Sequence, residues 1–239
     1  MIRFISLLFL VGSSFVVKSQ ESTLGSWNII NMKIPVRKNW SIFGESQLRS
    51  LSFYQQFHYY EFKAGISFVP LKNLSLTIGA GTYQTYAEGG NFKLPKNNNE
   101  FRCWPQLVLL QSIGKIRVEQ RYRAELRFTS NGYRNRFRYR LGISYPIIND
   151  KQKRPLLQLI ASNEIFFTNR EPYFERNRAM IGFQKKINEM CALQFGYLHQ
   201  FDYKINDETG RDFLQIGCYF DLKSKCVQVA SSESDLKEN

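Results

Sequence analysis

The sequence predicts an all-β protein, an antiparallel up-and-down transmembrane β-barrel of about 10–12 strands. Charged and apolar residues alternate along most of the chain, most regularly between Lys115 and Leu141. A short apolar segment with a cationic start opens the chain, and no apolar run of the roughly 18 residues needed for a transmembrane helix follows it. The alternation therefore indicates strands, and any crossing of a membrane would have to use them.

The stretch from Lys115 to Leu141 shows the two faces most clearly. Every second residue is charged on both sides of a turn at Ser130-Asn131-Gly132, and the residues between them are mostly apolar. Successive strand side chains point to opposite faces, so one face of these strands is charged and the other is apolar. The charged positions are Lys115, Arg117, Glu119, Arg121, Arg123, Glu125, Arg127, Arg134, Arg136, Arg138 and Arg140.

Eleven segments of the chain alternate in this way, and none shows the 3.6-residue period of a helix. Single-chain bacterial barrels have an even number of strands, so a count of eleven needs an explanation. Either Leu24–Ile34 is not a full strand, or a further strand lies in Pro146–Pro155 or in the C-terminal tail. The segments are Leu24–Ile34, Lys38–Leu51, Phe57–Val69, Asn73–Tyr86, Glu100–Gln111, Lys115–Phe128, Arg134–Tyr145, Leu156–Thr168, Phe174–Ile187, Met190–Tyr203 and Arg211–Leu222.

The chain divides into three parts. Residues 1–19 combine Arg3, an apolar core from Phe4 to Val11 and small residues, which is typical of a signal peptide cleaved after Ser19. Residues 20–222 form the expected barrel domain, and residues 223–239 form a polar tail that we expect to be disordered. This organisation predicts the outer membrane of a Gram-negative bacterium as the location of the barrel after signal-peptide cleavage.

The connections alternate in length along the chain. Short turns are expected at 35–37, 70–72, 112–114 and 188–189, and mostly longer polar loops at 52–56, 87–99, 129–133, 169–173 and 204–210. Ala87–Asn99 is the longest loop, and Pro146–Pro155 is long where a short turn is due. Short turns on one rim and long loops on the other are typical of outer-membrane barrels, whose short turns are periplasmic.

Strand length and aromatic residues favour the same architecture. Crossing a bilayer takes about 9–11 tilted residues, and nearly every segment is longer than that. Aromatic pairs gather toward segment ends, as they do in the girdles of membrane barrels. These pairs are Tyr54 and Phe57, Tyr83 and Tyr86, Phe128 and Tyr133, Tyr173 and Phe174, and Phe201 and Tyr203.

Alternation alone leaves open which face is inside. A membrane barrel turns its apolar face to lipid, whereas a soluble lipocalin-like periplasmic barrel carrying an apolar ligand would expose Arg121 and Arg138 to water. The opening segment, the strand lengths and the loop asymmetry favour the membrane barrel. Its lumen would be either a rigid network of its own side chains, which we favour for a small barrel, or an anion-attracting passage. The predicted lumen-lining network is Glu45, Glu61, Arg102, Arg117, Glu119, Arg121, Arg123, Glu125, Arg127, Arg136, Arg138, Arg140, Glu164, Arg176 and Arg178.

The order of the segments resembles the domain-of-unknown-function 2490 proteins over nearly the whole mature chain. The resemblance is one of pattern, and it implies an outer-membrane β-barrel, mostly of Bacteroidetes-type bacteria, without an assigned activity or functional residue. The stretches that carry it are Trp27 and the short strand after it, Ile42–Arg49, Phe62–Phe68, Leu74–Gly81, Glu119–Arg123 and Arg136–Arg140.

No catalytic, cofactor-binding or metal-binding constellation is evident, and we expect neither enzymatic activity nor a cofactor. The two histidines, His58 and His199, are expected on the lipid-facing wall as girdle residues. Barrel lipid hydrolases carry a serine two residues after the histidine, where Tyr60 and Phe201 stand, so a membrane-embedded lipid-modifying enzyme is the weakest alternative. The four cysteines show neither CxxC spacing nor a nearby histidine, which argues against zinc.

The basic composition, with a net charge of +13, also raises nucleic acid as a partner. A sheet that binds single strands places aromatic and cationic side chains on one face. In this chain the two kinds alternate onto opposite faces, so we expect no nucleic acid. Outer-membrane lipid is the expected partner, and the sequence leaves the solute and the oligomeric state open.

Overall fold

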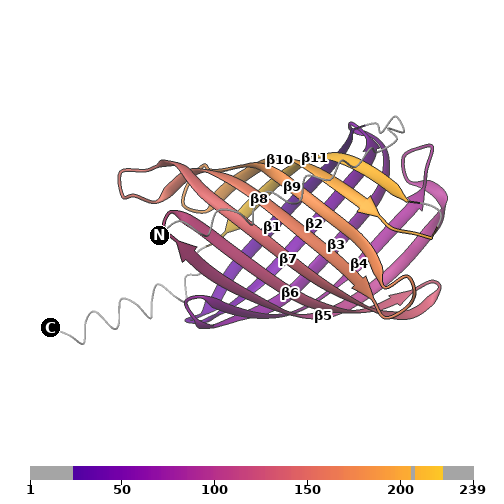
Figure 1. Cartoon of the computed structure of the whole chain (residues 1–239), viewed down its shortest axis with the longest axis horizontal. Helices are drawn as coiled ribbons and strands as arrows, with labels where there is room; N and C mark the ends of the chain where they lie inside the picture. The colour runs from indigo at the N-terminus through magenta and orange to yellow at the C-terminus, as the bar shows by residue number, and fades with distance from the viewer. Residues whose placement is uncertain (1–23, 206–207, 223–239) are drawn as a thin grey trace, which may run out of the picture.

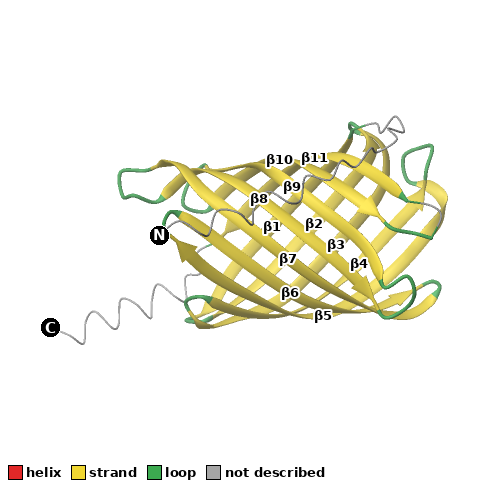
Figure 2. Ribbon diagram, in the orientation of Figure 1, coloured by secondary structure: helices red, strands yellow, loops and turns green. Residues whose placement is uncertain are grey.

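The computed structural model describes residues 24–205 and 208–222, which form a closed barrel of eleven strands in chain order (Figures 1 and 2). Each strand from β2 to β11 pairs antiparallel with the strand before it. The described residues include no helix long and apolar enough to span a bilayer. The strands are β1 (Gly25–Arg37), β2 (Trp40–Ser52), β3 (Gln55–Leu71), β4 (Leu74–Ala87), β5 (Lys93–Ile113), β6 (Ile116–Thr129), β7 (Gly132–Asn149), β8 (Pro155–Thr168), β9 (Phe174–Lys186), β10 (Cys191–Asp202) and β11 (Thr209–Asp221).

The barrel closes through a parallel pair, β1 with β11, in register from Gly25 opposite Phe213 to Lys33 opposite Asp221. Consecutive strands of a meander alternate in direction, so with eleven strands the first and the last run the same way. The predicted antiparallel barrel of 10–12 strands is confirmed with eleven strands, of which only this pair is parallel among the described residues. The segment starting at Leu24 is a full strand of 13 residues, and Pro146–Pro155 holds no additional one. The tail at 223–239 and the segment 1–19 lie outside the described residues.

The turns define two rims. We call rim A the one with turns at 38–39, 72–73, 114–115, 150–154 and 187–190, and rim B the one with turns at 53–54, 88–92, 130–131 and 169–173 and the connection between β10 and β11. Gly114 and Gly132 adopt positive φ beside two of the tight turns, where a left-handed backbone is needed. Strand β1 begins at rim B and β11 ends at rim A, so the described chain starts and finishes at opposite rims.

Both rims have shorter connections than the sequence predicts. The expected loop Ala87–Asn99 is only the five-residue turn 88–92, because β5 starts at Lys93 and its first residues pair with the end of β4. The expected connection Pro146–Pro155 shortens to 150–154 for the same reason, since β7 continues to Asn149. Polar composition suggested loops at these places, but backbone pairing with a neighbouring strand satisfies the same peptide groups.

The two faces of the wall differ in the way the alternation requires. On the outer wall, Ile78 is 74% exposed and Phe62 is 56% exposed. On the inner wall, the side chains of Glu125 and Arg136 are 0% and 3% exposed. Two aromatic clusters accompany the charges inside, one around Trp27 and Phe213 and one around Tyr59, Tyr83 and Trp104. The second cluster includes a residue that we expected in a girdle, since Tyr83 is 2% exposed and lies inside.

Candidate functional site: the charged interior of the barrel

The interior cavity has a volume of about 1280 Å³ and reaches both rims, from Arg117 and Gln184 near rim A to Arg170 and Glu171 at rim B. All the residues of the predicted network face this interior. Glu125 is 1% exposed and lies behind the others, against the wall. The members of the predicted network that line the cavity are Glu45, Glu61, Arg102, Arg117, Glu119, Arg121, Arg123, Arg127, Arg136, Arg138, Arg140, Glu164, Arg176 and Arg178.

Glu125, in β6, is the centre of the most buried part of the network. Its Oε2 accepts from Arg136 Nη2 at 2.6 Å, and its Oε1 accepts from Arg138 Nη1 at 2.6 Å. Arg123 and Arg102 lie within 3.6 and 3.8 Å of the same carboxylate. Four guanidinium groups thus surround one carboxylate, an arrangement in which charge-assisted bonds compensate for lost hydration.

A second cluster lies nearer rim B. Oε2 of Glu100 accepts from Arg102 Nη2 at 2.8 Å, Oε1 of Glu100 lies 2.8 Å from Arg102 Nε as an ion pair, and Glu100 also pairs with Arg127. Glu175 on β9 accepts from Arg127 and Arg136, which links it to the group around Glu125. These pairs join β5, β6, β7 and β9 across the lumen, so the side chains hold the barrel wall together from within.

Strands β1 to β3 contribute a third cluster. Arg49 lies over the ring of Trp27 at 3.4 Å and over that of Tyr59 at 4.0 Å, and its Nη2 is 3.3 Å from Glu61. Lys63 pairs with Glu61 at 2.5 Å and with Glu45. The aromatic rings here act as cation–π partners as well as packing groups.

Interior aromatic residues are the part of the site that the sequence analysis missed. Phe166, which is fully buried, lies beneath four guanidinium groups, and Arg178 stacks between Phe166 and Trp27 at 4.7 and 4.8 Å. The available signal was register, because Phe166 is two residues from the inward-facing Glu164. The position of Phe166 in the period of the strand places it inside.

The side chains that face the interior differ along its length. Toward rim B, buried arginines and glutamates form what we call the plug. The plug residues are Glu100, Arg102, Arg123, Glu125, Arg127, Arg136, Arg138 and Glu175. Toward rim A, small or neutral residues on β7 to β10 face the lumen, and we call this part the vestibule. The vestibule residues are Gly142, Ser144, Ser162, Met180, Gln184 and Gln194.

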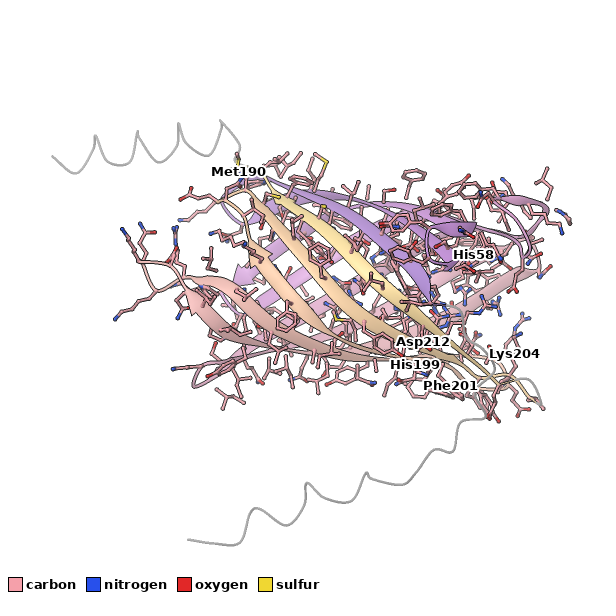
Figure 3. All side chains as sticks on the ribbon, turned by 90° about the horizontal axis from the view of Figure 1, so that it is seen from above. His58, Met190, His199, Phe201, Lys204 and Asp212 are labelled. Carbon is pink, nitrogen blue, oxygen red and sulfur yellow. The ribbon has the colours of Figure 1, made fainter. Side chains whose placement is uncertain are left out.

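The two histidines lie on opposite faces of the wall (Figure 3). His199 faces outward near rim B, and its Nδ1 is 2.7 Å from Asp212, which also accepts from Tyr197 at 2.5 Å. His58 faces the interior and is 8% exposed, so the expectation of a lipid-facing ring was wrong for it. It is the additional residue of a β-bulge: Arg49 pairs with Tyr59 but the next residue pairs with Phe57. A bulge shifts the alternation by one position, and no periodicity predicts it.

Residues that could bind a metal ion are not grouped in the described part of the chain, and its cysteines are not bonded to one another. No three His, Cys, Asp or Glu residues there are grouped to hold a metal ion. Cys103, Cys191 and Cys218 are free thiols. His199 lies in β10. Neither β10 nor the neighbouring strand β9 contains a serine that would serve as a nucleophile next to the His199–Asp212 pair.

Comparison with known proteins identifies a family and no annotated relative. A family model described as "Protein of unknown function (DUF2490)" matches residues 24–211, most of the chain. No curated protein and no solved structure matches the sequence or the fold.

Proposed function

Because the chain belongs to the DUF2490 family, whose members have no known function, we propose a function from the geometry: an integral outer-membrane β-barrel with an Arg/Glu-lined lumen. The lumen has a structural role as a side-chain network, and the cavity that reaches both rims favours a second role as a narrow anion-attracting passage. The arginines and lysines that line it outnumber the acids, which attracts anions.

The observation that carries the proposal is the inverted polarity of the wall. Arg138 points inward, with its side chain 10% exposed, while its neighbour Phe137 points outward and is 52% exposed. A soluble lipocalin-like barrel requires the reverse, with arginines in water and apolar side chains in the core. An apolar surface extending around the barrel is stable in hydrocarbon and costly in water.

Strand length and the outer aromatic residues support the same proposal. Every strand has 12 or more residues, enough for the roughly 9–11 that a tilted strand needs. Aromatic rings contact one another on the outer wall near rim B, as an interfacial girdle would. These contacts join Phe57 with Phe92, Tyr60 with Tyr86, Phe128 with Tyr133, Phe167 with Phe174, and Phe174 with Phe201.

Fractionation of cells expressing the full chain tests the location. We expect the protein in the outer-membrane fraction, resistant to extraction by carbonate or urea and released by detergent. Recovery as a soluble periplasmic monomer, with or without bound lipid, would refute the proposal and favour the lipocalin-like alternative.

Conductance in planar bilayers separates the structural role from the passage. A passage predicts small, anion-selective steps in symmetric salt, because the plug narrows the lumen and its excess arginines attract anions. Silence in bilayers, together with membrane insertion, would leave the structural role alone.

A further inference from the structure

The vestibule is a pocket that the barrel's own side chains leave open. Gly142 pairs with Ser162, and Ser162 pairs with Met180, so three neighbouring strands present small or flexible side chains at one level. A Cβ added at Gly142 would meet only Glu119, at 3.6 Å. The space there is therefore available to a solute that enters from rim A.

Arg121 and Arg140 form the floor of the vestibule, where it meets the plug. They are directly opposite each other on β6 and β7, and both line the cavity. Like charges placed opposite each other on one face of a sheet destabilise the pairing. Such a pair therefore requires a negative charge between its members.

The neighbouring pair shows how the barrel meets this requirement elsewhere. Arg123 and Arg138 are also directly opposite each other, and Glu125 lies within 3.6 Å of the first and 2.6 Å of the second. Glu164 is directly opposite Arg140 in register and 2.6 Å from Arg121, but no carboxylate of the described chain forms ion pairs with both arginines. Arg121 shares Glu164 with Arg138, at 2.6 Å, and Arg140 pairs separately with Glu119.

Hydrogen bonding of the floor is also incomplete. The Nε atoms of both Arg121 and Arg140 are buried and have no partner among the described residues. A buried guanidinium N–H without an acceptor is costly, and such groups normally find one. Tyr219, from β11, also lines the cavity.

We propose that the vestibule binds an oxyanion, the phosphate or carboxylate group of a small solute, between Arg121 and Arg140. Planar guanidinium forks match both kinds of anion in geometry and charge. The bound oxyanion would take the place that Glu125 takes between Arg123 and Arg138. This site deepens the proposed anion-attracting lumen, but it requires no membrane: binding in detergent and fractionation of cells can fail independently.

Isothermal titration calorimetry on the full-length protein purified in detergent tests the site, at constant ionic strength. Inorganic phosphate and succinate are the two probes, and saturable binding of either one supports the proposal and identifies the group. The double variant Arg121→Gln/Arg140→Gln should weaken binding at least tenfold, because each lost charged donor contributes about that factor. Arg154→Gln is the matched control, since it removes a positive charge from an exposed turn at the same rim and should change nothing.

Gly142→Leu provides a second variant that keeps every charge. Its side chain has room beside Glu119 and would occupy the vestibule, so binding should be lost while the secondary structure stays unchanged by circular dichroism. This variant decides the question if the double arginine variant does not fold. The proposal is overturned if neither probe binds the wild type saturably, or if Gly142→Leu binds as the wild type does.

Discussion

Removal of the Glu125 carboxylate is the sharpest test of the plug. Glu125→Gln keeps the size of the side chain but removes the negative charge that lies 2.6 Å from both Arg136 and Arg138. The Glu125 side chain is 0% exposed there. Breaking a buried ion pair by removing one member destabilises proteins by about 3–5 kcal/mol. Glu119→Gln is the matched control, because Glu119 has one arginine partner and its side chain is 34% exposed, so we expect about 1 kcal/mol or less.

Equilibrium unfolding in urea, with the protein in detergent micelles, measures the difference. With a urea m-value of about 2 kcal/mol/M, the Glu125→Gln midpoint should fall by about 1.5–2.5 M and the Glu119→Gln midpoint by about 0.5 M or less. A double-mutant cycle with Arg136→Gln should show strong coupling for Glu125 and none for Glu119, because Glu125 contacts Arg136 and Glu119 does not. Equal midpoint shifts for the two glutamine variants would refute the reasoning that the plug stabilises the barrel.

Three further predictions follow from the geometry. Gly79→Val should destabilise the barrel by about 1–3 kcal/mol and shift the tryptophan emission, because a Cβ there would lie 2.6 Å from the Trp104 ring, whereas Gly44→Val has open space and should be near neutral. In the turn 150–154, hydrogen bonds from the backbone N–H of Arg154, and then from its side chain, lower the pKa of Asp150 below 3.8. The stability that this carboxylate contributes is therefore lost only as the pH falls through its depressed value, and in Arg154→Gln a carboxyl NMR titration should still find the pKa below normal. Rim B holds most of the connections expected to be long, so we propose that it faces the outside of the cell. In a cysteine-free background, an impermeant maleimide added to intact cells should label Ser130→Cys at rim B and not Gln152→Cys at rim A, and the opposite pattern would contradict this orientation.

Much of the wall was predictable from the sequence because the period of a strand is a local property. Each side chain's face depends on its distance in sequence from its neighbours, so Arg121, Arg138 and Glu164 were expected to share one face, and all three line the cavity. The eleven strands were also found, since each is longer than the turns between them. The same period places the buried Phe166 inside, two residues from Glu164, although Phe166 was not among the residues expected in the lumen.

Contacts between strands decided the rest, since those depend on residues far apart in the chain. The parallel closure of β1 on β11 follows only once the sheet is known to be closed, and the bulge that turns His58 inward exists only relative to β2. The sequence determined which residues face the lumen, whereas register determined which arginine meets which carboxylate. That is why Glu125 is shared by four guanidinium groups, while Arg121 and Arg140 face each other and no carboxylate of the described chain forms ion pairs with both.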